Sequence, residues 1–257
     1  MNFETLDKIL LEKKGKIIHQ IWFDMGNGKH PSQEFVKPWN ELNPDYYYHL
    51  WTENDCKELI ANYYNYFLKF YNKYPYTIQR IDSVRYFFLH RYGGFYCDVD
   101  FECLQPIKIM MKKYRKDLYL VESPNCIDEL YDSISNCFMY SIPKHTFWKK
   151  VHKELVRRAT KDFYNRHFQI MMTTGPSMLT DVFQNCKDKF NLGVFPRKFF
   201  NPCGICDDRC VKTSKMFTVH RNNGSWENKD SRILKFLLCN WKLIVYIICI
   251  LTIIYLI

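Results

Sequence analysis

The first half of the chain alternates between short apolar runs and longer stretches in which apolar residues recur at helical spacing. Residues 16–22 read KIIHQIW, and residues 46–51 read YYYHLW after an Asn-Pro-Asp turn signal. Short runs of β-branched and aromatic residues bounded by turn residues are typical of buried strands. We therefore predict a strand at each of these two runs.

Helices are predicted where the apolar spacing changes to the 3.6-residue period. This holds over residues 54–71, where Asn54 can cap, and over residues 77–92, where Gly93 and Gly94 end the helix. Three further strands and one further helix follow, at 95–101, 118–122, 136–140 and 147–160. Because strands alternate with helices, the sequence predicts an α/β fold with a largely parallel sheet.

The two ends of the chain differ from this middle part. Residues 1–15 mix charged and apolar positions and predict a short amphipathic helix. Residues 243–257 carry no charge, and the apolar stretch counted from Phe236 reaches the roughly 20 residues that a membrane-spanning helix needs. We expect a main domain over residues 16–231 and a C-terminal membrane anchor, a transmembrane helix, over residues 236–257. The alternative is a buried C-terminal helix.

The charges beside the apolar segment predict its orientation. Arg232, Lys235 and Lys242 lie on its N-terminal side. Positively charged residues favour the cytosolic face of a membrane. We expect a single-pass membrane protein whose main domain lies in the cytosol, with the lumen of the Golgi or endoplasmic reticulum as the alternative.

Composition excludes some classes of protein and leaves others open. Apolar residues make up 47% of the 257 residues, which excludes a disordered chain. The formal net charge is +10, but the lysines are spread along the chain, so we do not predict a nucleic-acid surface. A basic surface also suits nucleotide diphosphates or anionic lipid headgroups.

The chain has eleven cysteines, and only Cys203, Cys206 and Cys210 form a local cluster. The cluster is consistent with half of a zinc site, a disulfide loop or free thiols. A structural zinc needs a fourth ligand, and none lies at a matching spacing. We expect free thiols in a reducing compartment.

The candidate chemistry begins with Asp98 and Asp100, two carboxylates that are two residues apart. On a strand both would point to the same face. Adjacent carboxylates repel each other unless a cation lies between them, and a hard divalent ion would also bind a diphosphate. Asp-x-Asp is common by chance, so the pattern needs support from its surroundings.

That support comes from the preceding helix. Asp82 and Arg85 are separated by three residues and share one helical face, and the turn at Gly93 and Gly94 returns the chain directly to Asp98. Arg85 supplies a cation for a phosphate or for Asp82. The alternative is a surface ion pair.

These residues resemble a known family. IDSVRY at 81–86 and YGGFYCDVD at 92–100 are similar to the DXD sugar-binding region of family 32 glycosyltransferases, of the initiating mannosyltransferase and inositol-phosphoceramide mannosyltransferase type. Five further segments match in the family's order, namely 16–22, Trp39 with 43–52, 135–138, 174–176 and His220 with 224–226.

The resemblance implies a GT-A-like nucleotide-sugar-binding fold and a role for each matching residue. Asp98, Asp100 and Arg85 would act in catalysis, with Asp100 and His220 at the metal. Asp98 would contact the donor ribose or sugar, and Asp82 and Arg85 would hold the same part of the donor. The remaining substrate contacts would come from Trp22 at the nucleotide base, Asn136 at the donor sugar or acceptor, and Ser225 and Trp226 closing the site.

The resemblance also implies an activity. It is transfer of a hexose, mannose in the nearest relatives, from a GDP- or UDP-sugar to a glycan or glycolipid acceptor with retention of configuration. Mn²⁺ or Mg²⁺ would stabilise the leaving diphosphate. No residue can be assigned as a covalent nucleophile. The alternative function is a membrane protein that binds nucleotide sugars without turnover.

Overall fold

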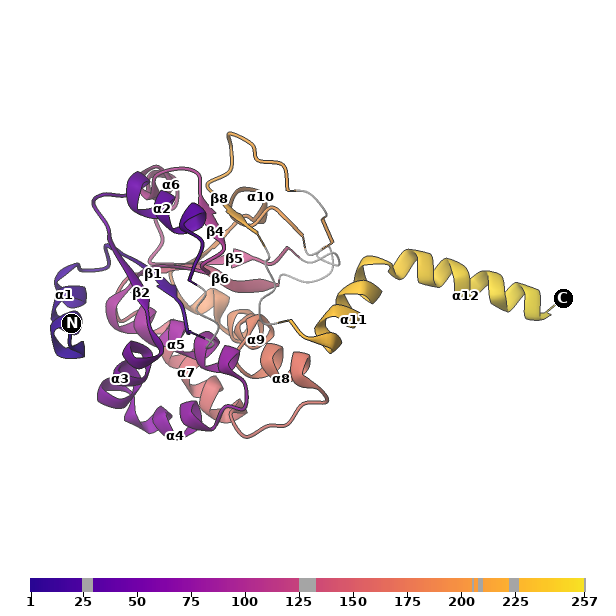
Figure 1. Ribbon diagram of the computed structural model, residues 1–257, viewed down its shortest axis with the longest axis horizontal. Coiled ribbons are helices and arrows are strands. Elements are labelled where there is room, and N and C mark those ends of the chain that lie inside the picture. The colour runs from indigo at the N-terminus through magenta and orange to yellow at the C-terminus, as the bar shows by residue number, and fades with distance from the viewer. Residues whose placement is uncertain (25–29, 125–132, 205, 208–209, 222–226, 257) are drawn as a thin grey trace.

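The computed structural model describes residues 1–24, 30–124, 133–204, 206–207, 210–221 and 227–256. Its centre is a six-stranded sheet in the order β2-β1-β3-β6-β5-β7, beside a two-stranded sheet formed by β4 and β8 (Figure 1). The strands are β1 Ile17–Ile21, β2 Tyr47–Trp51, β3 Gly94–Cys97, β4 Phe101–Cys103, β5 Leu118–Glu122, β6 Ile134–Ser141, β7 Leu192–Phe195 and β8 Thr218–His220. The strands predicted at 16–22, 46–51, 118–122 and 136–140 are confirmed.

The main sheet is mixed rather than largely parallel. β1 is parallel to β2 and β3, and β5 is parallel to β7, but β6 is antiparallel to both of its neighbours. Only residues 123–133 connect β5 to β6. This is too short for the helical crossover that a parallel neighbour requires, and the sequence prediction did not take this length into account.

Helices cover both faces of the sheet (Figure 1). Alternate strand residues enter two separate cores, so that Tyr96 and Met139 pack on one face while Phe95 and Phe138 pack on the other. Helices on the first face are α3 Glu53–Tyr63, α4 Asn65–Lys73, α5 Thr77–Tyr92, α7 Phe147–Arg158 and α9 Pro176–Cys186. Those on the second are α2 Gln33–Leu42, α6 Ile107–Lys113 and α10 Arg197–Phe200. α1 Phe3–Glu12 adds Leu6 and Leu10 to the first core, and α8 Arg166–Thr173 packs against α9.

The turn between α5 and β3 requires both of its glycines. Gly93 and Gly94 have φ of +66° and +96°, values that other residues rarely adopt. A Cβ on Gly93 would lie 2.6 Å from Pro143 N, and one on Gly94 would lie 2.5 Å from Ile17 O. The predicted end of the helix is confirmed, and the turn lets β3 enter directly beside β1.

The helix predicted over 54–71 is two helices. The chain breaks at Tyr64, which has φ −138° and ψ 40°. The Tyr64 ring packs against Phe87, and its hydroxyl lies 2.8 Å from His90 Nδ1, so tertiary contacts favour the break. Thr52, not Asn54, caps α3, through a capping box with Asp55.

The C-terminal segment forms two helices, α11 Lys229–Cys239 and α12 Trp241–Leu256, and α12 projects from the domain (Figure 1). Among the described residues no single helix is long and apolar enough to cross a membrane, but α11 and α12 pass that test as a pair bent by 71°. The alternative of a buried C-terminal helix is wrong, because Leu243, Tyr246 and Leu251 expose 55%, 64% and 59% of their surface.

The expectation of free thiols is wrong for the cysteine cluster. Cys203 pairs with Cys210, and Cys206 pairs with Cys239 at the end of α11. The partner of Cys206 lies outside the cluster, and local spacing could not identify it. The other described cysteines are free: Cys56, Cys97, Cys103, Cys137, Cys186 and Cys249.

Candidate active site

The site lies where the strand order of the sheet reverses. From β1 the chain passes to β2 on one side, and later to β3 on the other. In open α/β sheets the crevice beyond the carboxyl ends of such strands is the usual ligand site. Trp22 directly follows β1, with its backbone N–H donating to Trp51 O at 3.0 Å, and Asp98 directly follows β3.

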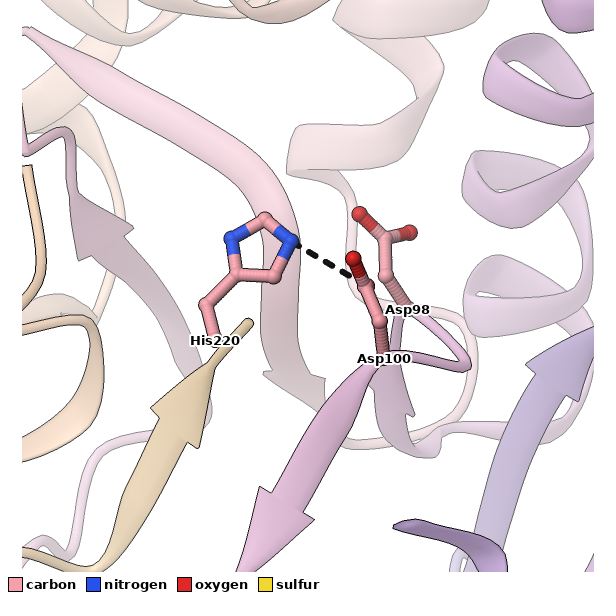
Figure 2. A group of neighbouring side chains, drawn as sticks. All are labelled: Asp98, Asp100 and His220. Atoms are coloured by element: carbon pink, nitrogen blue, oxygen red, sulfur yellow. Dashed lines mark ion pairs between the residues drawn. The ribbon is translucent and has the colours of Figure 1, made fainter. Parts of the chain in front are cut away.

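Asp98 and Asp100 lie in a turn between β3 and β4 rather than on one strand, so the strand-based prediction of their common face is wrong. The turn closes with a hydrogen bond from Phe101 N–H to Asp98 O at 3.0 Å, and Asp98 N–H donates to Cys137 O at 2.9 Å. The two carboxylates nevertheless come together, with His220 beside them (Figure 2).

His220 reaches the site because β8 pairs with β4, with His220 opposite Phe101. Its ring stacks on Phe101, and its Nε2 lies 3.1 Å from Asp100 Oδ1. Burial opposes the charge on His220. The charge and hydrogen bond of Asp100, together with Cys137, outweigh burial and hold the pKa of His220 well above its usual value.

The chemistry of this group fits a divalent cation. One ligand atom from each of Asp98, Asp100 and His220 lies within 4.8 Å of the others. Carboxylate oxygens suit Mg²⁺ and Mn²⁺, and imidazole suits a first-row transition ion. The side chains retain 28%, 15% and 14% exposure respectively, so a diphosphate could reach an ion held there.

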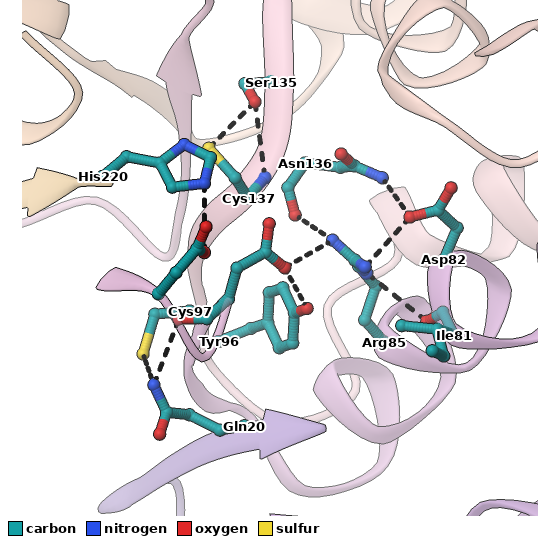
Figure 3. A network of polar contacts seen from close by, with 12 residues as sticks. Gln20, Ile81, Asp82, Arg85, Tyr96, Cys97, Ser135, Asn136, Cys137 and His220 are labelled. Carbon is teal, nitrogen blue, oxygen red and sulfur yellow. Dashed lines mark hydrogen bonds and ion pairs between the residues drawn. The ribbon is translucent and has the colours of Figure 1, made fainter. Parts of the chain in front are cut away.

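Arg85 lies beneath this turn and is buried, with 3% of its side chain exposed. Its Nη2 lies 2.9 Å from Asp82 Oδ1, and its Nη1 donates to Asp98 Oδ1 at 3.1 Å and to Asn136 O at 2.9 Å (Figure 3). The guanidinium also lies over the Tyr96 ring at 4.5 Å. The alternative of a surface ion pair is therefore wrong.

These contacts keep Arg85 ionised and connect it to the acidic turn. Burial lowers the pKa of Arg85, but Tyr96, Asp98 and Asp82 outweigh it, and the net shift is upward. Both Arg85 and the Tyr96 hydroxyl donate to Oδ1 of Asp98. Burial raises the pKa of Asp98, with Arg85 opposing the shift.

Asp82 is held by β6 and by the segment before α9. Asn136 Nδ2 donates to Asp82 Oδ1 at 3.1 Å and to the Tyr86 hydroxyl at 3.1 Å, and Thr174 Oγ1 donates to Asp82 Oδ2 at 3.5 Å. Burial disfavours the charged form and raises the pKa of Asp82 to about 6, although Arg85 lowers it. The structure therefore brings Asp82, Arg85, Asp98 and Asn136 into one network.

Gln20 and Tyr48 also support the acidic turn, and sequence reasoning did not identify them. Gln20 Nε2 donates to Asp98 O at 3.1 Å, and the Tyr48 hydroxyl donates to Gln20 Oε1 at 2.6 Å. The available signal was a glutamine, fully buried here, within an apolar strand. The predicted Ser225 and Trp226 lie outside the described residues, and Trp22 is half-buried at the carboxyl end of β1.

Comparison with known proteins agrees with this geometry. Residues 30–117 match the family model described as "Glycosyltransferase sugar-binding region containing DXD motif". The acidic turn lies within this match, which supports the resemblance to glycosyltransferases that contain the DXD motif. The resemblance to the inositol-phosphoceramide mannosyltransferase type of family 32 is confirmed by relatives in two yeasts.

The first of these relatives is inositol phosphoceramide mannosyltransferase 2 of Schizosaccharomyces pombe. It is 30% identical over 85% of this chain and 60% of its own length. Mannosyl phosphorylinositol ceramide synthase CSH1 of Saccharomyces cerevisiae is 31% identical over 77% of this chain and 49% of its own length. The chain thus spans three fifths or less of these two relatives. Among solved structures, the PaToxG glycosyltransferase has 17% identity and a TM-score of 0.46 over 71% of this chain and 75% of its own.

Proposed function

We propose that this chain is a membrane-anchored, divalent-metal-dependent, retaining glycosyltransferase with a GT-A-like fold. It transfers a hexose from a nucleotide sugar to a glycan or glycolipid. The observation that supports this best is the convergence of Asp98, Asp100 and His220 at the carboxyl-end crevice, with both aspartates inside the DXD match over residues 30–117.

Asp100 and His220 would hold the cation, and Asp98 would complete the site. Within the described part of the chain, Arg85 and Tyr96 both donate to Oδ1 of Asp98, which leaves Oδ2 for the ion or for a donor hydroxyl. When bound, the ion would act as a Lewis acid toward the diphosphate and favour the leaving nucleoside diphosphate. Asp98 and Asp100 would orient the donor so that the anomeric carbon faces the acceptor.

Arg85 would act as a positioning residue. Its hydrogen bonds go to oxygens of Ile81, Asp82, Asp98 and Asn136. Its positive charge partly offsets the two carboxylates at the base of the site. Asp82 and Asn136 would form the wall that faces the donor sugar. Trp22 would contact the base, because it leaves β1 at the same edge of the sheet.

The names of the relatives suggest the substrates. The first is named an inositol phosphoceramide mannosyltransferase, and the second a mannosyl phosphorylinositol ceramide synthase. For this chain we therefore propose transfer of mannose from a GDP-sugar to a glycolipid. A UDP-sugar is the alternative donor.

The function is tested by release of nucleoside diphosphate. Purified full-length chain in detergent is given GDP- and UDP-sugars with a glycolipid acceptor, with Mn²⁺, with Mg²⁺ or with excess chelator. We expect release with one donor, only when metal is present and severalfold faster with acceptor. Donor binding without release would instead support a non-catalytic nucleotide-sugar-binding protein, and release in chelator would refute metal dependence.

The membrane anchor would be α12, whose side chains from Leu243 onward are uncharged. The Cys206–Cys239 disulfide favours the lumenal alternative over the cytosolic placement that Arg232, Lys235 and Lys242 predict, because disulfides persist in oxidising compartments. The positive-inside tendency is statistical, whereas a native Cys206–Cys239 bond requires oxidation.

We therefore expect the domain to be protected from added protease in sealed microsomes and to become sensitive after detergent treatment. Non-reducing gels should show faster migration of wild type than of Cys206→Ser. Digestion of the domain without detergent would instead show that the domain lies in the cytosol.

A pH dependence follows from the buried Asp82 carboxylate. Its pKa of about 6 means that it becomes protonated as the pH falls through 6, and we expect kcat/KM for the donor to fall with it. The folded state binds this proton more tightly than the unfolded chain does. The contribution of Asp82 to the free energy of unfolding should therefore decrease as the pH rises from about 4, the ordinary pKa of an aspartate, to about 6. Activity and stability should therefore change in opposite directions.

Asp82→Asn removes the titrating group, so both pH slopes attributed to it should disappear. Donor kinetics and urea midpoints, measured at several pH values between 4.5 and 7.5 for both proteins, test this. If the fall in kcat/KM at acidic pH is unchanged in Asp82→Asn, a group other than Asp82 causes it.

A further inference from the structure

The outward face of α11 is apolar. Ile233, Phe236 and Leu237 recur at the i, i+3, i+4 spacing of one helical face and expose 61%, 63% and 45% of their surface. An apolar face that is exposed to water is unfavourable, and it marks a contact with a partner or a membrane.

The other side of α11 is fixed to the catalytic domain at both ends. In its first turn, Asp230 Oδ2 accepts from His167 N–H of α8 at 3.0 Å, and Ser231 Oγ lies 3.0 Å from His167 Nδ1. At its last residue, Cys239 is bonded to Cys206. The apolar face is therefore held in one direction relative to the active site.

Two features identify a bilayer as the occupant of this face. The first is continuity, because the face leads directly into α12, which is apolar on every side and begins with the half-exposed Trp241, a residue favoured at membrane interfaces. The second is charge. Basic residues greatly outnumber the single acidic Asp230 along α11 and its junction with α12, and they are Lys229, Arg232, Lys235 and Lys242.

We propose that α11 is an interfacial helix that lies in the headgroup region of the bilayer and holds the catalytic domain against it. The proposal rests on the proposed function only for the insertion of α12. If α12 follows the membrane normal, the 71° bend places α11 about 20° from the membrane plane. This replaces the continuous anchor over 236–257 with a short insertion that begins at Trp241.

The arrangement limits the height of the active site above the membrane. β8 ends at His220, and α11 begins at Lys229. An extended chain of that length spans at most about 30 Å. The His220 group therefore lies within about 30 Å of the first turn of α11. A rigid attachment at this height favours an acceptor that is carried in the same bilayer.

The depth of α11 can be measured without turnover. Full-length chain is reconstituted in vesicles of phosphatidylcholine and phosphatidylinositol, with a fluorescent amino acid at position 233, and quenched by lipids that carry nitroxide at the headgroup or deep in the acyl chain. Position 57 in α3 and position 250 in α12, both exposed, serve as controls for solvent and for the bilayer interior.

We expect position 233 to be quenched severalfold more by the headgroup nitroxide than by the deep one, position 250 to show the reverse, and position 57 to show neither. Position 233 behaving like position 57 would place α11 outside the bilayer and overturn the proposal. Position 233 behaving like position 250 would make α11 part of the span, which also overturns it. Because no donor or acceptor is present, these outcomes are independent of nucleoside diphosphate release.

Discussion

Replacing Asp100 by Asn should reduce transfer by at least about 100-fold and weaken the dependence of donor binding on Mn²⁺. Asp100 offers a carboxylate within 3.1 Å of His220 Nε2, in the group that can hold the cation. The neutral amide is a weaker ligand for a hard ion than the carboxylate is. The measurements are donor titrations with and without metal, and steady-state release of nucleoside diphosphate.

Two comparisons give this result its meaning. Asp162→Asn changes an exposed aspartate outside the site and should leave transfer unchanged. Asp98→Asn should also abolish transfer, but with a stability loss of about 1–3 kcal/mol, because Arg85 and Tyr96 both donate to its Oδ1. Full activity of Asp100→Asn, or activity unaffected by chelator, would refute the metal-dependent mechanism.

The parts of the site that sequence could predict are local in the chain. Helical spacing places Asp82 and Arg85 on one face, and the two-glycine turn returns the chain to Asp98 in the same sheet, so their proximity follows from short-range rules. The glycines at 93 and 94 are required by positive φ and by close approach to Pro143 and Ile17.

The parts that sequence could not predict depend on register and tertiary contact. The contact of His220 with Asp100 requires β8 to pair with β4 in one particular register, and His220 was identified only through the family resemblance. The support that Gln20 and Tyr48 give to Asp98 crosses strands in the same way. The break at Tyr64 likewise depends on packing against Phe87, which the apolar period alone does not contain.

The second large effect is expected for Arg85→Lys, which keeps the charge but loses the planar group. One ammonium cannot reach Asp82 Oδ1, Asp98 Oδ1 and Asn136 O together, and it cannot stack on Tyr96 as the guanidinium does. We expect the free energy of unfolding to fall by about 2 kcal/mol, because the buried carboxylates lose part of the positive charge that compensates them. We also expect the KM for the donor to rise at least about tenfold, because the acidic turn is no longer held in place. Thermal unfolding and donor kinetics measure the two effects separately. Arg80→Lys on the same helix is the matched control. Arg80 Nη2 lies 3.4 Å from the half-exposed Glu53 Oε1 and donates to Thr77 Oγ1 at 3.2 Å, and a partly exposed ion pair of this kind contributes about 0–1 kcal/mol. A lowered melting temperature with normal donor kinetics would make Arg85 a structural residue only. Unchanged stability would mean that the buried network does not depend on the guanidinium geometry.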